Sequence, residues 1–249
     1  MSFTTWTPPA VASERKPLAL TLWRAVEAQH VVSTMPLVDS LEEQAVLERV
    51  LEAGKPQIPA DARALHYLMF TPFRYPTAAT DANRASRFRG AQDPGVFYGA
   101  DEIRTACAEL GYWRWRFLLD SPDLPRIDAR AQTLFQVSVH APGIALDAPP
   151  FTADDEDAAR WTHPTDYTAC QAFARLAREA GVGVIRYTSV RDPRHGRAAA
   201  VLSPRAFDAP HPRETTTWML TVRRDRVIWQ RDDLQLRDSF EFEATAWQA

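Results

Sequence analysis

The order of strand and helix signals along the chain most constrains its fold. Strand signals outnumber helix signals, and they do not alternate regularly with helices as they would in a parallel βαβ protein. The sequence therefore predicts an α+β protein with a twisted antiparallel or mixed sheet and flanking helices. Expected strands cover residues 18–26, 95–100, 132–147, 182–190, 197–204 and 215–230, and expected helices cover residues 40–54, 60–70, 102–119 and 166–180.

Two of the expected helices lie together near the N-terminus and predict a helical insert at about residues 38–70. The first has a capping box formed by Ser40 and Glu43, and Gly54 is a natural stop. Its apolar face comprises Leu41, Val46, Leu47, Val50 and Leu51. We expect residues 1–17 to be a flexible lead-in and residues 18–249 to form one domain that closes with a β-hairpin at about 214–243. Asp101 is expected to cap the helix that starts at residue 102.

Composition excludes several classes of protein. A net charge of −3 and a pI of about 6.1 give no basic face for direct nucleic-acid binding. There is no apolar run long enough to span a membrane and no signal-peptide core at the start, so we expect a soluble, cytoplasmic protein. Cys107 and Cys170 lie among apolar neighbours and are expected to be buried free thiols. The histidines are scattered and no CxxC motif occurs, so no metal is expected.

A short segment between residues 86 and 109 concentrates the chemically interesting side chains. Arg87 and Arg89 precede a turn, Tyr98 ends an apolar strand, and Glu109 lies on the following helix. Arginine at strand ends and in loops is typical of phosphate-binding sites, and Arg24 in the first strand fits the same description. Helical periodicity places Glu109 on a solvated face and Tyr98 in the core. The residues alone leave open an ordinary surface or one wall of an anion-binding pocket.

The stretches "RFRG…PGVFYGADEIRTACAE" and "GVIRYTSVRDPRHGRAAAVLSPRAF" resemble the RES domain, from about Leu22 to Phe207. RES domains supply the toxins of bacterial Xre–RES toxin–antitoxin pairs. The resemblance implies an ADP-ribosyltransferase-like fold, NAD+ as substrate and no metal requirement. It assigns catalytic roles to Arg87, Tyr98, Glu109 and Ser189. It also implies that NAD+ is bound by Arg24, Arg89, Arg87, Tyr98 and Ser189.

The implied activity is cleavage of the nicotinamide–ribose bond by hydrolysis or phosphorolysis. The implied partner is a helix-turn-helix antitoxin of the Xre type, with a homodimer or a hetero-oligomer with the antitoxin as possible assemblies. One alternative is an ADP-ribosyltransferase that modifies a specific cellular protein. A second is a non-catalytic NAD-binding or interaction module, because "RAAAVL" replaces a strand in which the family often carries an asparagine.

Overall fold

A computed structural model describes residues 6–28, 37–74, 85–152 and 155–248. The α-helices are α1 (Pro8–Ser13), α2 (Leu41–Ala53), α3 (Tyr67–Arg74), α4 (Ile103–Leu119), α5 (Asp155–Thr162) and α6 (Thr168–Glu179). The strands are β1 (Lys16–Glu27), β2 (Phe97–Ala100), β3 (Ile127–Ala145), β4 (Val184–Thr188), β5 (Arg197–Val201), β6 (Glu214–Val222), β7 (Arg226–Arg231) and β8 (Ser239–Glu243). Short 3₁₀ turns are η2 (Ala60–Ala62), η4 (Pro204–Ala206) and η5 (Ala244–Trp247).

The strands form one 8-stranded sheet in the order β1-β2-β5-β4-β3-β6-β7-β8. Strand β1 also pairs with β3, so β1, β2, β5, β4 and β3 form a closed ring of hydrogen-bonded neighbours. Strands β3 and β4 run parallel, whereas the other pairs are antiparallel. The predicted α+β class with a mixed sheet and flanking helices is confirmed.

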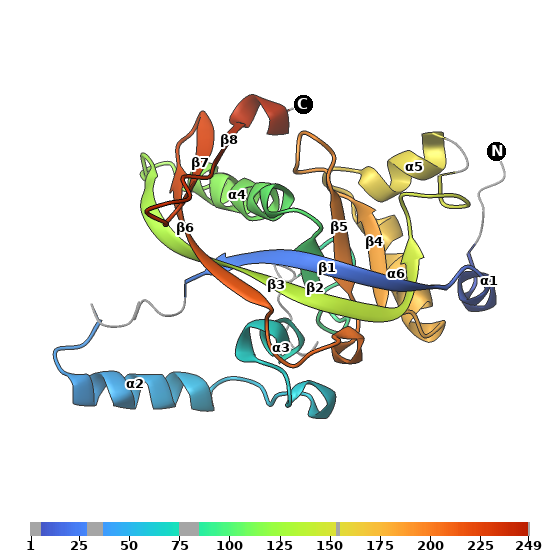
Figure 1. Cartoon of the computed structure of the whole chain (residues 1–249), viewed down its shortest axis with the longest axis horizontal. Coiled ribbons are helices and arrows are strands. Elements are labelled where there is room, and N and C mark those ends of the chain that lie inside the picture. Colours follow the sequence, from blue (N-terminus) through green and yellow to red (C-terminus); the bar gives the residue numbers. More distant parts are fainter. Residues whose placement is uncertain (1–5, 29–36, 75–84, 153–154, 249) are drawn as a thin grey trace.

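The two faces of the sheet carry separate hydrophobic cores. Helices α4 and α6 cover one face, where Trp115, Phe173 and Trp218 are buried (Figure 1). Helix α3 covers the other face, where Met69 and Phe97 are buried. Strand residues alternate between the cores because successive side chains point to opposite faces. This alternation sends Tyr98 to the face that carries α4.

Several predicted element boundaries are wrong. Residues 6–17 are not a flexible lead-in, because they contain α1 and the start of β1, and Val11 is fully buried; residues 1–5 lie outside the described part. The second insert helix runs from Tyr67 to Arg74 rather than over 60–70. The bounds predicted for the C-terminal hairpin, about 214–243, agree with the span from β6 to β8, and β8 is a third strand within it. Asp101 does not cap α4: Glu102 occupies the N-cap position and makes no side-chain capping bond.

Helix α2 starts as predicted, but its apolar face does not pack against the rest of the described protein. Ser40 accepts a hydrogen bond from the Glu43 amide at 3.1 Å, as in a capping box. The helix projects from the rest of the protein, and Gln44 is the one buried side chain in it (Figure 1). Val50 and Leu51 are therefore exposed. Periodicity predicted the helix correctly but could not show that the described residues leave its face uncovered.

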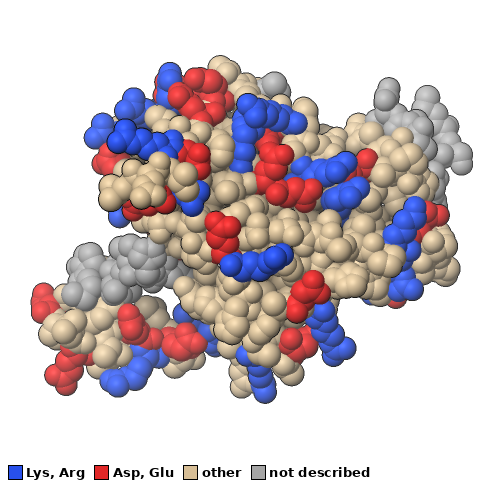
Figure 2. Space-filling view, in the orientation of Figure 1, with Lys and Arg blue, Asp and Glu red and all other residues tan. Residues whose placement is uncertain are grey.

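The surface seen in the same orientation mixes basic and acidic side chains without an extended area of one sign (Figure 2). Cys107 and Cys170 are free and buried, as the sequence predicted. Among the described residues, no helix has the length and apolarity to span a membrane.

Candidate active site

A cavity of about 200 Å³ lies between β1, β2 and α4. The turn that carries Ser86 and Arg87 and the loop after β4 complete its wall. Four residues singled out from the sequence line it: Arg24, Arg87, Tyr98 and Glu109. The fold therefore brings together side chains that are far apart in the chain.

Glu109 points into this cavity from the second turn of α4 and is half-buried. Ser189 follows β4 in the chain and is fully buried. Its hydroxyl donates a hydrogen bond to Glu109 Oε1 at 2.6 Å. Burial raises the pKa of Glu109, and the Ser189 hydrogen bond and the guanidinium groups of Arg87 and Arg191 oppose this rise. The solvated position predicted for Glu109 is wrong, because the loop after β4 covers that side of α4.

Tyr98 links strand β2 to the turn that carries Arg87. Its hydroxyl accepts the Phe88 amide at 2.9 Å and shares a hydrogen bond with Ser86 Oγ at 2.8 Å. Burial raises the pKa of Tyr98 to about 12, so the phenol stays protonated at neutral pH. The tyrosine thus fixes the turn as well as lining the cavity.

Arg24 reaches the cavity from β1. One guanidinium nitrogen donates to the Tyr98 carbonyl at 2.8 Å, and the group lies 4.8 Å from the centre of the Phe97 ring. Its Nε is buried and has no hydrogen-bond partner. Burial lowers the pKa of Arg24 to about 10, which leaves the group charged at neutral pH. A buried cationic donor without an acceptor favours an anionic ligand at this position.

Two further arginines that line the cavity both contact Tyr167. Arg87 is 7% exposed, donates to the Trp161 carbonyl at 3.0 Å, and lies 4.7 Å from the ring centre of Tyr167. Arg191 donates to the Tyr167 hydroxyl at 2.9 Å and stacks on Tyr112 at 3.7 Å. The charges of Arg87 and Arg191 partly offset the effect of burial on the Glu109 carboxylate, whose pKa stays raised.

Sequence reasoning missed several residues of this site. Arg191 and Tyr167 line the cavity together with Tyr187 and the half-exposed Trp113. The position of Arg191, two residues after Ser189, was a usable signal. Tyr167 and Tyr187 had none, because an aromatic residue beside a helix or in a strand reads as core. His195, which stands in the same loop, is exposed and adopts a φ of 54° at the turn.

Arg89 does not line the same cavity. It lies in an adjoining cavity of about 250 Å³, whose wall also includes Arg24, Ser86 and Tyr98. Its Nε donates to the Asp93 carbonyl at 3.1 Å. Arg24 and Tyr98 thus stand between the two cavities, and a ligand longer than the Glu109 cavity would extend past them toward Arg89.

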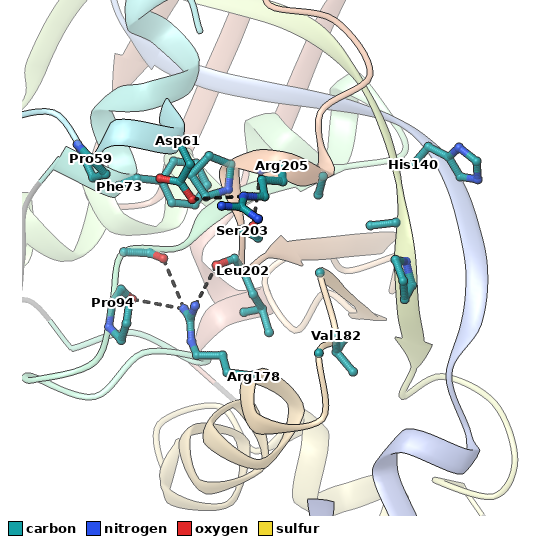
Figure 3. Close-up of a pocket in the computed structure, with 17 residues that line it drawn as sticks. Pro59, Asp61, Phe73, Pro94, His140, Arg178, Val182, Leu202, Ser203 and Arg205 are labelled. Carbon is teal, nitrogen blue, oxygen red and sulfur yellow. Dashed lines mark hydrogen bonds and ion pairs between the residues drawn. The ribbon is translucent and has the colours of Figure 1, made fainter. Parts of the chain in front are cut away.

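A larger cavity of about 550 Å³ lies elsewhere, between the ends of α6 and β5 and the chain near Pro94 (Figure 3). Its arginines are occupied: Arg178 donates to the carbonyls of Leu202, Pro94 and Gly95, and Arg205 is paired with Asp61 at 3.9 Å. The Glu109 cavity, with its carboxylate and unpaired donor, is the better reaction site. Across the described ranges, no group of three or more histidine, cysteine or acidic residues is placed to hold a metal.

Comparisons with known proteins agree with the sequence motifs. No curated protein matches the sequence at a significant level. A chain from the crystal structure of the M. tuberculosis MbcT–MbcA toxin–antitoxin complex is similar at 12% identity and a TM-score of 0.43, covering 97% of this chain and 94% of that chain. The RES domain family matches residues 58–223, which include Arg87, Tyr98, Glu109 and Ser189. This match spans well over half of the sequence, and the chain therefore belongs to the RES domain family.

Proposed function

We propose that this chain is an enzyme that cleaves the nicotinamide–ribose bond of NAD+, by hydrolysis or phosphorolysis. The observation that carries the proposal is the shared cavity of Glu109, Arg24 and Arg87. One carboxylate and two guanidinium groups suit a ligand that carries a pyrophosphate and develops positive charge at a sugar carbon. The RES family assignment supports the same substrate.

The residues take distinct roles in this reaction. When the C–N bond breaks, nicotinamide leaves as a neutral molecule with the bonding electron pair, and the ribosyl carbon becomes cationic. The Glu109 carboxylate stabilises that charge, and the bond from Ser189 holds the carboxylate in place. Water or phosphate then attacks the ribosyl carbon. Ser189 is fully buried, so it acts on Glu109 rather than as a nucleophile.

The arginines bind rather than react. The guanidinium charge of Arg24 attracts the pyrophosphate, with Arg87 in the same cavity and Arg89 in the adjoining cavity. Tyr98 offers its ring to the nicotinamide end, since its hydroxyl is engaged by Ser86 and Phe88. No step of this scheme uses a metal.

In the cell, we propose, the chain is a cytoplasmic toxin that an Xre-type antitoxin neutralises, and it assembles as a homodimer or as a hetero-oligomer with the antitoxin. The support is membership of the RES family. A toxin that cleaves NAD+ needs such control because NAD+ is present throughout the cytoplasm.

The experiment is an NAD+ turnover assay on the purified chain with product identification, with and without phosphate. We expect nicotinamide with ADP-ribose in water, or with a phosphorylated ADP-ribose when phosphate is the acceptor. Glu109→Gln should lower turnover by about 10²- to 10³-fold. Arg24→Lys keeps the charge but loses the fork, and should raise KM for NAD+ by about tenfold.

Two exposed charged residues that do not line the Glu109 cavity serve as controls. Glu102→Gln changes an exposed carboxylate at the N-cap of α4, and Arg205→Ala removes a guanidinium that is 82% exposed; both should turn over NAD+ as the wild type does. Clickable NAD+ with host lysate tests for a transferase, because label on a protein would replace free ADP-ribose. Binding of NAD+ without any consumption would overturn the enzyme assignment and leave a binding module.

A further inference from the structure

The loop between β4 and β5 is folded around the hydroxyl of Ser189. The Ser189 amide donates to the Gly196 carbonyl at 2.8 Å, which closes the loop at its base. The amides of Arg191 and Asp192 donate to Ser189 Oγ at 3.2 and 3.1 Å. Both acceptor positions of the hydroxyl are thereby filled, and its hydrogen is directed to Glu109.

Asp192 connects this loop to the start of α4. Asp192 is only 2% exposed. Its carboxylate accepts hydrogen bonds from the Arg104 guanidinium and from Thr105 Oγ1, the latter at 2.7 Å. The Arg194 amide donates to the same carboxylate at 3.0 Å. A buried carboxylate needs such partners, because the desolvation of an unpaired charge is costly. Asp192 thus has a complete set of donors, two of them from the first turn of α4.

The same turn of α4 leads directly to Glu109. Thr105 and Glu109 are four residues apart and so lie on the same side of the helix. Asp192 contacts Ser189 directly and reaches Glu109 only through α4: its amide donates to Ser189, and its carboxylate accepts from Thr105, one turn before Glu109. The position of Ser189 relative to Glu109 is therefore set across this bridge.

The chain passes close to this bridge at Gly196. A side chain at Gly196 would collide with Thr105 Oγ1, and its Cβ would lie 2.9 Å from Asp192 Oδ2. The preceding residue, His195, adopts the left-handed φ of 54° while its amide donates to the Asp192 carbonyl at 2.8 Å. The loop is closed tightly over the Asp192 carboxylate.

From these contacts we infer that Asp192 is a positioning residue, which ties the Ser189 loop to α4 through the hydrogen bond from Thr105 and so sets the contact between Ser189 and Glu109. Its effect on turnover rests on the proposed function, whereas its effect on the loop does not. Replacing Asp192 itself would leave Arg104 unpaired, so the sharper test changes Thr105, which is fully buried. Thr105→Val removes the donor at nearly constant shape, and Thr105→Ser keeps it.

The first measurement is hydrogen exchange at the amides of Arg191 and Asp192, with Ser189→Ala as the reference in which their acceptor is absent. We expect faster exchange in Thr105→Val and wild-type exchange in Thr105→Ser. Equal protection in the valine variant and the wild type would overturn the inference. This arm needs no turnover, so it stands even if the wild type leaves NAD+ unchanged, a result that would refute the proposed function instead.

The second measurement is a double-mutant cycle on NAD+ turnover. Thr105→Val should lower kcat by about 10- to 100-fold with KM unchanged. The arginines that bind NAD+ stay in place, whereas the Glu109 carboxylate is misplaced. Combined with Ser189→Ala, it should add little, because both changes act through the same contact. Two results would contradict the positioning role. One is a loss of kcat in the double variant equal to the product of the two single losses, and the other is a kcat of Thr105→Ser as low as that of Thr105→Val.

Discussion

Glu109 shows how a half-buried carboxylate can lower stability while serving the reaction. Its pKa is raised above the ordinary value of 4.5 because burial disfavours the charged form. The folded protein thus holds this proton more tightly than the unfolded chain does. The wild type loses stability as pH rises from about 4.5 through the raised pKa, and Glu109→Gln removes that loss.

We therefore expect Glu109→Gln to be at least as stable as the wild type at pH 7 while being far less active. The gain should disappear at low pH, where both side chains are neutral. Urea unfolding at several pH values measures the difference, and NAD+ turnover of the wild type should rise with pH through the raised pKa. The measured quantity is the free energy of unfolding of Glu109→Gln minus that of the wild type. A difference that is smaller at pH 7 than at pH 4 would contradict this account.

Tyr98 supports a second prediction at the scale of one atom. Tyr98→Phe keeps the ring and removes the oxygen that accepts the Phe88 amide and bonds Ser86. The free energy of unfolding should fall by about 1–2 kcal/mol, because a partly buried amide loses its acceptor. Because the turn with Arg87 is loosened, KM for NAD+ should rise more than kcat falls. Calorimetry and steady-state kinetics test both parts, and a variant with unchanged KM would argue against the turn as part of the site.

At the scale of elements, the C-terminal turn η5 bears on the active-site loop. The indole of Trp247 donates to the Arg191 carbonyl at 2.7 Å, and its ring packs near Tyr112 and Trp115. Trp247→Phe keeps an aromatic ring but loses the donor, and should cost about 1 kcal/mol of stability together with part of kcat. Trp247→Ala removes the packing as well and should cost more. Thermal unfolding and turnover of the two variants separate the hydrogen bond from the packing, and equal losses in both would assign the whole effect to the hydrogen bond.

The helices and strands were easier to predict from the sequence than the tertiary contacts between them. The strand at Phe135, Val137 and Val139 alternates as expected, because period-2 patterning follows directly from strand geometry. Glu109 could not be placed by the same means: the covering loop is 80 residues away in sequence. Arg89 was grouped with Arg87 by proximity in the chain, yet the turn directs them into different cavities. The motif resemblance supplied what periodicity could not, because it carries tertiary information.

At the scale of the whole molecule, α2 stands apart from the two cores that hold the sheet. Replacing Val50 and Leu51 by glutamine should leave the free energy of unfolding within about 0.5 kcal/mol of the wild type, since both side chains are exposed. Leu68→Ala in α3, a residue only 6% exposed, is the contrasting variant and should cost about 2–5 kcal/mol. Chemical denaturation compares them. A large loss from the α2 change would mean that α2 packs against the body of the protein after all.

The closed ring of strands is unevenly joined. Strand β1 is paired with β3 along all 12 of its residues, whereas it meets β2 at the single pair Trp23↔Ala100. This thin joint lies beside Arg24 and Tyr98, at the cavity itself. Parting β1 from β2 breaks one residue pair, whereas parting β1 from β3 breaks 12. The ring of strands is therefore weakest at the joint beside the candidate active site.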